Sequence, residues 1–233
     1  YAAFLKEGWF KIDECAEPMV ILDKFRADPI ANKLDTPSGK IEIFSQVIAG
    51  FGYGDCPPHP AWLTPPEWLG GKQHDSQLHL LCNQPTHKLH SQLDHGSVSR
   101  AAKIGGHEPV LINADDAAAR GITDGAIVRV FNARGACLCG ARVSRQIMRG
   151  VLMISTGAWF DPDISGESGL DCKHGNPNVL TPDRGTSSLA QGPAAHSCLV
   201  DIEPWVGAPV EVTAFTAPQI VQTGPTAQMD DDK

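Results

Sequence analysis

A dense set of side chains able to bind a polar ligand lies in residues 83–92, NQPTHKLHSQ. The amides can both donate and accept hydrogen bonds, and the imidazoles and the lysine can contact anionic groups. The segment directly follows an apolar run at residues 78–82, so these side chains stand on a loop at the end of an expected strand. Taken alone, the pattern fits either a ligand-binding loop or a polar loop that is merely solvated.

A second polar segment spans residues 174–192, HGNPNVLTPDRGTSSLAQG. It contains glycines, prolines, asparagines and hydroxyl residues, but its large apolar side chains are only Val179, Leu180 and Leu189. These are too few for a core helix or an ordinary strand, so we expect an irregular loop. A loop with no role beyond the surface would leave its glycines and polar groups unexplained.

Short apolar runs separated by turn signals predict about six β-strands from residue 76 onward, the number expected of a small closed barrel. The runs lie at residues 78–82, 109–112, 126–131, 136–143, 150–155 and 197–202. Residues 132–135 are expected to form a tight hairpin between the third and fourth runs. One helix is expected at residues 114–120, with Asn113 as its N-cap and Gly121 to end it.

Residues 1–75 differ from the barrel region because they are dense in Pro and Trp, as in DCPPHPAW at 55–62. Proline is excluded from long helices and central strands, so we expect an extended arm over a surface. Within it, the turn signal at 36–39 precedes the alternating run KIEIF at 40–44, which predicts a half-buried strand. We therefore expect an arm at 1–75, a barrel domain at 76–217 and a flexible acidic tail at 218–233.

The chain has 233 residues, is 42% hydrophobic and carries a formal net charge of -8 at pH 7. Its Lys and Arg are scattered, whereas a duplex-binding surface needs clustered cations, so no nucleic-acid partner is expected. No apolar run is long enough to cross a bilayer, so no membrane insertion is expected. The seven cysteines include no CxxC pair, and Cys137 and Cys139 lack further ligands at zinc spacing, so we expect free buried thiols.

A resemblance to a known family is carried by residues 109–155, PVLINADDAAARGITDGAIVRVFNARGACLCGARVSRQIMRGVLMIS. This run resembles the C-terminal molybdopterin-dinucleotide-binding domain of the dimethyl sulfoxide reductase family. The flanks are similar to the S-oxide and N-oxide reductase branch, through TPSGKIEIFS at 36–45, DCPPHPAW, NQPTHKLHSQLD at 83–94, STGAWFDP at 155–162 and the start of the second polar segment.

The resemblance implies a six-stranded, aspartate decarboxylase-like double-psi β-barrel that forms the last domain of a longer enzyme. It also implies two molybdopterin guanine dinucleotides (bis-MGD) that hold one molybdenum. In such enzymes the metal takes an oxygen atom from an S-oxide or N-oxide and is then reduced again by two electrons.

The resemblance also implies which residues contact the cofactor. They are Asn83, Gln84, Pro85, Lys88, His90, Ser91 and Gln92 on the first segment, Asn178 on the second, and Ala195 and His196 before the last strand. The family usually has Arg where this chain has Lys88, and a lysine keeps the charge but loses the bidentate fork. Gly175 and Gly185 are expected to let the backbone approach a flat ligand.

Three further positions stay open between two roles. Trp159, Phe160 and Asp161 either reach toward the substrate funnel or form a structural aromatic corner. The serine that ligates molybdenum in related enzymes lies upstream of this region, so we assign the chain no catalytic residue and no metal ligand.

The partners that the resemblance implies are the upstream domains of the same polypeptide, a small S-oxide or N-oxide, and an electron donor such as a c-type cytochrome. We expect a periplasmic location, or a cytoplasmic one for the biotin sulfoxide reductase type. The chain begins without Met and its first residues read like the middle of a domain, so we expect a piece of a longer enzyme that is inactive alone.

Two alternatives from other classes remain. One is a stand-alone double-psi barrel that serves as a binding module, which would not need the polar loops at 83–92. The other is a barrel decarboxylase that cleaves itself between Gly96 and Ser97 and works without molybdenum. An intact bond between these two residues would remove it.

Overall fold

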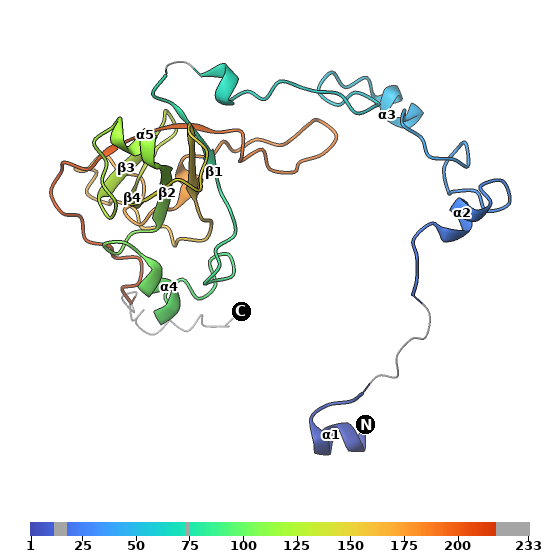
Figure 1. Cartoon of the computed structure of the whole chain (residues 1–233), viewed down its shortest axis with the longest axis horizontal. Helices are drawn as coiled ribbons and strands as arrows, with labels where there is room; N and C mark the ends of the chain where they lie inside the picture. The colour runs from blue at the N-terminus through green and yellow to red at the C-terminus, as the bar shows by residue number, and fades with distance from the viewer. Residues whose placement is uncertain (12–17, 73–74, 218–233) are drawn as a thin grey trace, which may run out of the picture. The chain divides into compact units, whose positions relative to one another are not determined.

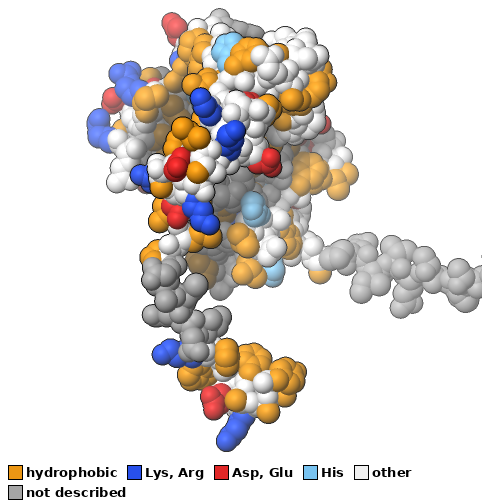
Figure 2. All heavy atoms as spheres, turned by 90° about the vertical axis from the view of Figure 1, so that its right-hand side faces the viewer, with side chains coloured by type: hydrophobic (Ala, Val, Ile, Leu, Met, Phe, Trp, Pro, Cys, Tyr) orange, Lys and Arg blue, Asp and Glu red, His pale blue; other side chains and the backbone are white. Residues whose placement is uncertain are grey.

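The computed structural model of the chain describes residues 1–11, 18–72 and 75–217. Its contacts divide it into two compact units, Tyr1–Trp62 and Leu63–Lys233. The tail predicted at 218–233 lies outside the described residues. None of the described helices is long and apolar enough to cross a bilayer. Figure 2 shows one face of the molecule, where Lys and Arg side chains lie among acidic and apolar ones.

The second unit is built on a β-barrel (Figure 1). The barrel is closed, and its six strands follow the order β1-β5-β2-β4-β3-β6. The strands are β1 (Leu78–Leu81), β2 (Pro109–Asn113), β3 (Ile127–Phe131), β4 (Ala136–Ser144), β5 (Val151–Ile154) and β6 (Leu199–Pro204). β1 pairs in parallel with β5, and β2 with β4, while the other neighbours are antiparallel. The predicted six-stranded, mainly β barrel is confirmed.

Apolar side chains at alternate strand positions fill the barrel. In β3, Val128 and Val130 are fully buried, whereas Arg129 between them is only partly buried. Leu80 of β1 and Leu152 of β5 likewise have no exposed surface. Because the barrel is closed, every strand has a partner on both sides and no sheet edge is left open.

The cysteines of this unit belong to the same core. The buried free thiols are Cys137, Cys139, Cys172 and Cys198. Burial raises the pKa of the partly buried Cys82 thiol to about 12 and that of Cys198 to about 11. The interpretation as free buried thiols is confirmed for the four, while Cys15 lies outside the described residues.

The predicted helix is α5 (Ala114–Ala118), which follows β2 directly. The Asn113 side chain accepts a hydrogen bond of 2.9 Å from the Asp115 amide, which confirms Asn113 as the N-cap. After the helix, Gly121 takes a left-handed φ of 66°, a conformation that favours glycine. The predicted hairpin is also present, and the Asn132 amide donates to the Gly135 carbonyl at 3.0 Å.

Residues 63–72 pack with the barrel, although the sequence patterns group them with the arm. The Glu67 carboxylate receives hydrogen bonds from both terminal nitrogens of Arg134 and one of 2.7 Å from the Leu199 amide. Burial disfavours the charged form of Glu67, but the bonds from Arg134 and Leu199 outweigh it and lower the pKa of the carboxyl. The segment, which includes η1 (Leu69–Gly71), is thereby held against the β3–β4 hairpin and the start of β6.

The first unit contains short helices in place of a wholly extended arm. They are α1 (Ala2–Glu7), α2 (Asp23–Ala27) and α3 (Gln46–Phe51), and none of them has a buried residue. The predicted strand at 40–44 is wrong, since these residues form no strand and Ile41 and Ile43 are 69% and 76% exposed. Alternation provides an apolar face, but the described residues of this unit contain no strand with which the segment could pair.

The sequence signals also miss α4 (Ser97–Ala102). The helix is short, begins after Gly96 without a side-chain cap, and contains two serines and a valine, so no local signal marks it. Its importance lies in its position, because Ser99 and the following Lys103 contact the buried ionic cluster described below.

Replacement of a barrel core residue tests the packing. Leu152→Ala removes a fully buried side chain and should lower the free energy of unfolding by about 2–5 kcal/mol, measured by urea titration of the 233-residue chain. Met148→Ala is the control, because Met148 is 63% exposed and its loss should change stability by no more than about 0.5 kcal/mol. Equal effects of the two substitutions would contradict this description of the core.

Candidate functional site

Two loops leave the barrel side by side because the strands before them are parallel neighbours. β1 and β5 pair in register, with Leu81 opposite Met153, so their carboxyl ends lie at the same end of the barrel. The loops after β1 and β5 are hydrogen-bonded to each other near their first residues, where the Thr156 amide donates to the Asn83 carbonyl at 2.9 Å. The Ser155 hydroxyl donates to the Asn83 side-chain oxygen at the same distance.

A third segment meets these two loops at a cavity of about 520 Å³. The polar residues that line it are His90 and Ser91 from the first loop, Thr156 from the second, and Asn176 and Asn178 from the second polar segment. His90, Ser91 and Asn178 are exposed and thus accessible to a ligand. Polar segments about ninety residues apart in the chain therefore converge on one cavity, as expected if both contact one cofactor.

Gly157 lets the first two loops touch. Its φ is 90°, and a Cβ built on it would overlap the carbonyl group of His90. Nearby, the Trp159 indole donates to the Ser91 carbonyl at 2.7 Å. The wall of the cavity is therefore formed by direct packing of one loop backbone on the other.

The third segment is held in place by its own local structure. η2 (Pro177–Val179) begins with Pro at a favourable position, and the Asn176 side chain accepts a hydrogen bond of 2.9 Å from the Asn178 amide. This cap orients the exposed Asn178 toward the cavity. The expectation of an irregular loop is confirmed.

A buried cluster of four charges, called the ion quartet here, lies next to the cavity loops. It consists of Lys88, Asp94, Lys103 and Glu108, whose side chains are at most 2% exposed. Each ammonium contacts Asp94 Oδ1 and Glu108 Oε2, at distances between 2.8 and 2.9 Å. Ser99 donates a further hydrogen bond of 3.1 Å to Asp94.

The contacts of the ion quartet favour the charged form of Asp94. Burial raises the cost of ionising Asp94, but hydrogen bonds from Lys88, Lys103 and the Trp159 amide outweigh it and hold the pKa well below the usual range. His174 lies beside the quartet, and burial lowers the pKa of its imidazole. Its Nδ1 donates to the Trp159 carbonyl at 2.9 Å.

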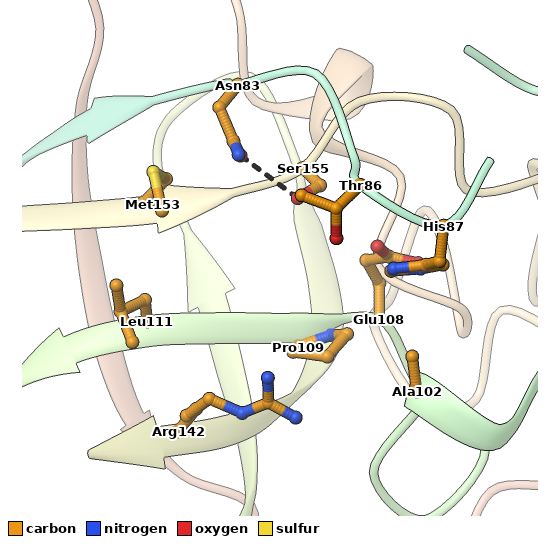
Figure 3. A pocket seen from close by; sticks show the side chains of 10 residues that line it. All are labelled: Asn83, Thr86, His87, Ala102, Glu108, Pro109, Leu111, Arg142, Met153 and Ser155. Atoms are coloured by element: carbon orange, nitrogen blue, oxygen red, sulfur yellow. Dashed lines mark hydrogen bonds between the residues drawn. The ribbon is translucent and has the colours of Figure 1, made fainter. Parts of the chain in front are cut away.

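A second cavity, of about 310 Å³, lies against the outer wall of the barrel (Figure 3). Asn83 and Ser155 stand at one end of it, Glu108 and His87 lie close together at another, and Arg142 of β4 points toward it. Both cavities thus use the loops that follow β1 and β5.

The structure separates the predicted contact residues into groups. His90, Ser91 and Asn178 line the first cavity, and Asn83 lines the second. Gln84 and Gln92 are exposed on the same loop, and Pro85 is partly buried there. Ala195 and His196 line neither cavity. His196 lies beside the end of β1, where its Nδ1 accepts a hydrogen bond of 3.4 Å from the Cys82 amide.

Some residues expected to face a ligand are engaged by the protein itself. The Lys88 ammonium has no exposed surface and is bound by two carboxylates, so it is not presented to a phosphate. Gly175 is buried, and a Cβ there would lie 2.8 Å from the Glu108 Cβ. A Cβ on Gly185 would overlap the Gln191 side chain. Packing within the chain therefore requires Gly175, whereas the exposed Gln191 side chain can move away from a Cβ at position 185.

Of the two roles weighed for residues 159–161, the structural one is observed for Trp159 and Asp161. The Trp159 ring packs near His95 and Phe215, and the buried Asp161 carboxylate accepts hydrogen bonds from the Thr213 amide and hydroxyl. Phe160 is 57% exposed and lines the first cavity.

Sequence reasoning assigned no role to Thr156, Gly157, Asp94, Lys103 and Glu108. Thr156 and Gly157 lie in the run STGAWFDP, which carries the family resemblance but gives no role for either residue. The ion quartet joins Lys88 and Asp94, both in the quoted run at 83–94, to Lys103 and Glu108 after α4, and no local pattern of charge paired these two segments.

Comparison with known proteins matches residues 78–199 to the family described as "Molydopterin dinucleotide binding domain". A trimethylamine-N-oxide reductase of Haemophilus influenzae is 46% identical over 213 residues, covering 91% of this chain and 26% of the relative. From Cereibacter sphaeroides, a dimethyl sulfoxide/trimethylamine N-oxide reductase and a biotin sulfoxide reductase are each 50% identical, covering 84% and 80% of this chain and 24% of each relative. The chain thus spans about a quarter of the length of these relatives.

Among solved structures, acetylene hydratase from Pelobacter acetylenicus is similar, with a TM-score of 0.61 and 17% sequence identity. The match covers 76% of this chain and 25% of that protein. At this identity the likeness concerns the fold alone.

Gly157→Ala tests the contact between the two cavity loops, with Gly166→Ala as its matched control. Both glycines have a left-handed φ, but only at Gly157 does an added Cβ meet another group within 4 Å. Gly166→Ala should cost about 1–2 kcal/mol of stability from backbone strain, and Gly157→Ala about 1–3 kcal/mol more. Urea unfolding measures the difference, and NMR shifts of the His90 and Ser91 amides should change only in the first variant. Indistinguishable variants would count against the packing described.

Proposed function

Because the chain belongs to the family of molybdopterin dinucleotide-binding domains, we propose that it forms the cofactor-binding part of a molybdenum-dependent S-oxide or N-oxide reductase. The observation that carries the proposal is the convergence of three polar loops on one cavity, all of them inside the matched range 78–199. Each loop supplies side chains or backbone groups suited to the polar edges of a pterin ring.

The first cavity fits part of such a cofactor. Its volume of about 520 Å³ lies in the range of small-molecule sites and suits a ring system, not a whole dinucleotide. Its amides, imidazole and hydroxyls can donate or accept along a ring edge or at a phosphate. The described residues contain no cluster of three or more His, Cys, Asp or Glu side chains arranged for a metal.

We propose that His90, Ser91 and Asn178 contact the cofactor directly from the first cavity. By their place in the motifs, Asn83, Gln84, Pro85, Gln92, Ala195 and His196 are proposed as further contacts at the rim of the site. Lys88 is left out of this set because its charge is neutralised inside the protein. The chain would thus orient the cofactor and shield it from water, the usual share of a protein in cofactor catalysis.

When bound, bis-MGD with its molybdenum would supply oxygen-atom transfer from the substrate and accept two electrons from a donor. The names of the relatives support trimethylamine N-oxide, dimethyl sulfoxide and biotin sulfoxide as substrate candidates. We propose the other domains of a longer polypeptide and an electron donor such as a c-type cytochrome as partners. We place the enzyme in the periplasm, with the cytoplasm as the alternative for the biotin sulfoxide type.

The first unit supports the proposal of a longer enzyme. Its large apolar side chains are exposed, among them Phe10 at 73%, Met19 at 92% and Trp62 at 75%. Exposed apolar surface of this extent marks an interaction site. We propose that the arm packs on domains that this sequence does not include.

The two alternatives from other classes gain no support. The matched family binds a dinucleotide, which a binding module without these loops would not do. Gly96 and Ser97 begin α4, with Ser97 exposed, and neither residue lines the first or second cavity.

Substitution of the exposed cavity residues tests the assignment. In the full-length enzyme, His90→Ala and Asn178→Ala should each lower molybdenum content about fivefold or more, because each removes a hydrogen bond to the cofactor. Stability should change little, since both side chains are exposed. Molybdenum per protein is the measurement, with Gln146→Ala, an exposed amide outside both cavities, as control. Wild-type metal content in both cavity variants would contradict these contacts.

The 233-residue chain by itself should reduce no S-oxide or N-oxide. It would cover only part of each dinucleotide, and the lost contacts would no longer offset the cost of immobilising a large cofactor. The test offers the purified chain extracted cofactor and a reduced viologen, and follows donor oxidation with dimethyl sulfoxide, trimethylamine N-oxide and biotin sulfoxide. Turnover above a cofactor-only control would show that the missing domains are not needed.

A further inference from the structure

We propose that the ion quartet is a positioning device for the first cavity, through which Lys88 and Lys103 act on the site without touching its ligand. The inference concerns the placement of the three loops, and it rests on the proposed function only where the ligand is taken to be the molybdenum cofactor.

The first step is the geometry of the quartet. The two ammonium groups share the same two oxygens, Asp94 Oδ1 and Glu108 Oε2, so the four charges alternate and sum to zero. Because all four are buried, removal of any one leaves an uncompensated charge in a medium that solvates it poorly. The position of each of the four side chains therefore depends on the presence of the other three.

The second step is that both carboxylate residues reach a cavity loop. Asp94 Oδ2 accepts a hydrogen bond of 2.9 Å from the Trp159 amide, on the loop after β5. The Glu108 amide donates to the His174 carbonyl at 3.1 Å, two residues before Asn176. His174 in turn donates to the Trp159 carbonyl. The quartet thus ties the second and third loops to one anchor.

The third step concerns the first loop, which carries His90 and Ser91. Lys88 and Asp94 bracket this loop and are joined at 2.8 Å. Between them, His90 and Leu93 have φ values of 50° and 63°, left-handed conformations that side chains other than glycine rarely adopt. Among the described residues, Leu22 is the only other non-glycine residue of this kind. A strained loop persists only where its surroundings hold it, and the Lys88–Asp94 pair closes the loop at its ends.

The shape of the first cavity therefore depends on the buried charges of the ion quartet, which do not line it. Loss of the quartet would free the Trp159 amide, let the loop at 88–94 relax from its left-handed conformations, and move His90 and Ser91 away from Asn178. Strand β3 would be affected much less, because its partners are β4 and β6, and the quartet residue Glu108 bonds to β4 through the Gly140 amide.

Hydrogen exchange of the 233-residue chain tests the inference without any cofactor. In Lys103→Met, exchange at Trp159 should accelerate at least about tenfold, because the amide loses a charge-assisted partner of fixed position. Exchange at Val130 in β3 should stay close to that of the wild type. The control is Arg129→Met, which breaks the 3.0 Å pair with Glu203 on the barrel surface and should leave Trp159 unchanged.

A second variant keeps the test decisive if Lys103→Met does not fold. Lys103→Met combined with Glu108→Gln restores a neutral cluster and should recover the fold while Trp159 still exchanges faster than in the wild type. Lys88→Arg, which preserves the charge, should leave exchange at Trp159 close to normal. Equal acceleration at Trp159 and Val130, or none at Trp159 in the double variant, would overturn the proposal.

The full-length enzyme separates this inference from the proposed function. If both hold, Lys103→Met lowers molybdenum content as well as protection at Trp159. If the wild-type enzyme holds no molybdenum cofactor but the exchange result stands, the proposed function fails and the positioning role survives. Normal molybdenum content in Lys103→Met, with Trp159 exchanging faster, would overturn the link between the quartet and ligand binding.

Discussion

The parallel pairing of β1 with β5 is the constraint on which the site depends. Parallel neighbours place their carboxyl ends together, so the loops at 83–92 and 155–160 must leave the barrel side by side. The segment that carries Asn176 and Asn178 follows an isolated parallel bridge between Cys137 of β4 and Cys172, which lies outside the six strands. The convergence thus begins with the strand pairing of the barrel, and contacts between the loops complete it.

The ion quartet lies where these loops meet, and its burial has an energetic cost. Moving charges out of water costs several kcal/mol per ion, and the mutual attraction of a buried group repays it only with close geometry and satisfied hydrogen bonds. Lys88, Lys103 and Asp94 meet that condition, although Glu108 Oε1 has no hydrogen-bond partner in the described part of the chain. The quartet therefore adds little net stability, and what it provides is a unique placement for loops that have few apolar side chains with which to define their own positions.

Local signals predicted the parts of the molecule that local physics determines. The strands, the Asn113 cap and the hairpin at 132–135 each follow from a pattern within a few residues, and the meeting of the two polar segments follows from the family resemblance. The strand expected at 40–44 failed because a strand needs a partner, which no pattern in the segment itself supplies. A glycine at position 175 indicates that some group approaches the backbone closely, and the sequence analysis took this group to be a ligand. The group is Glu108, which lies more than sixty residues away in the sequence.

Lys88 shows why a residue in a binding motif need not touch the ligand. Its neighbours His90 and Ser91 are exposed and line the cavity, whereas its own charge is fully buried between Asp94 and Glu108. Two carboxylates facing one position demand a cation there, and a guanidinium, with donors on several sides, would meet the same demand as an ammonium. A requirement for charge within the protein therefore accounts for the cation at position 88. Burial separates the two kinds of motif residue: exposed positions are available to the cofactor, and buried charged positions hold the exposed ones in place.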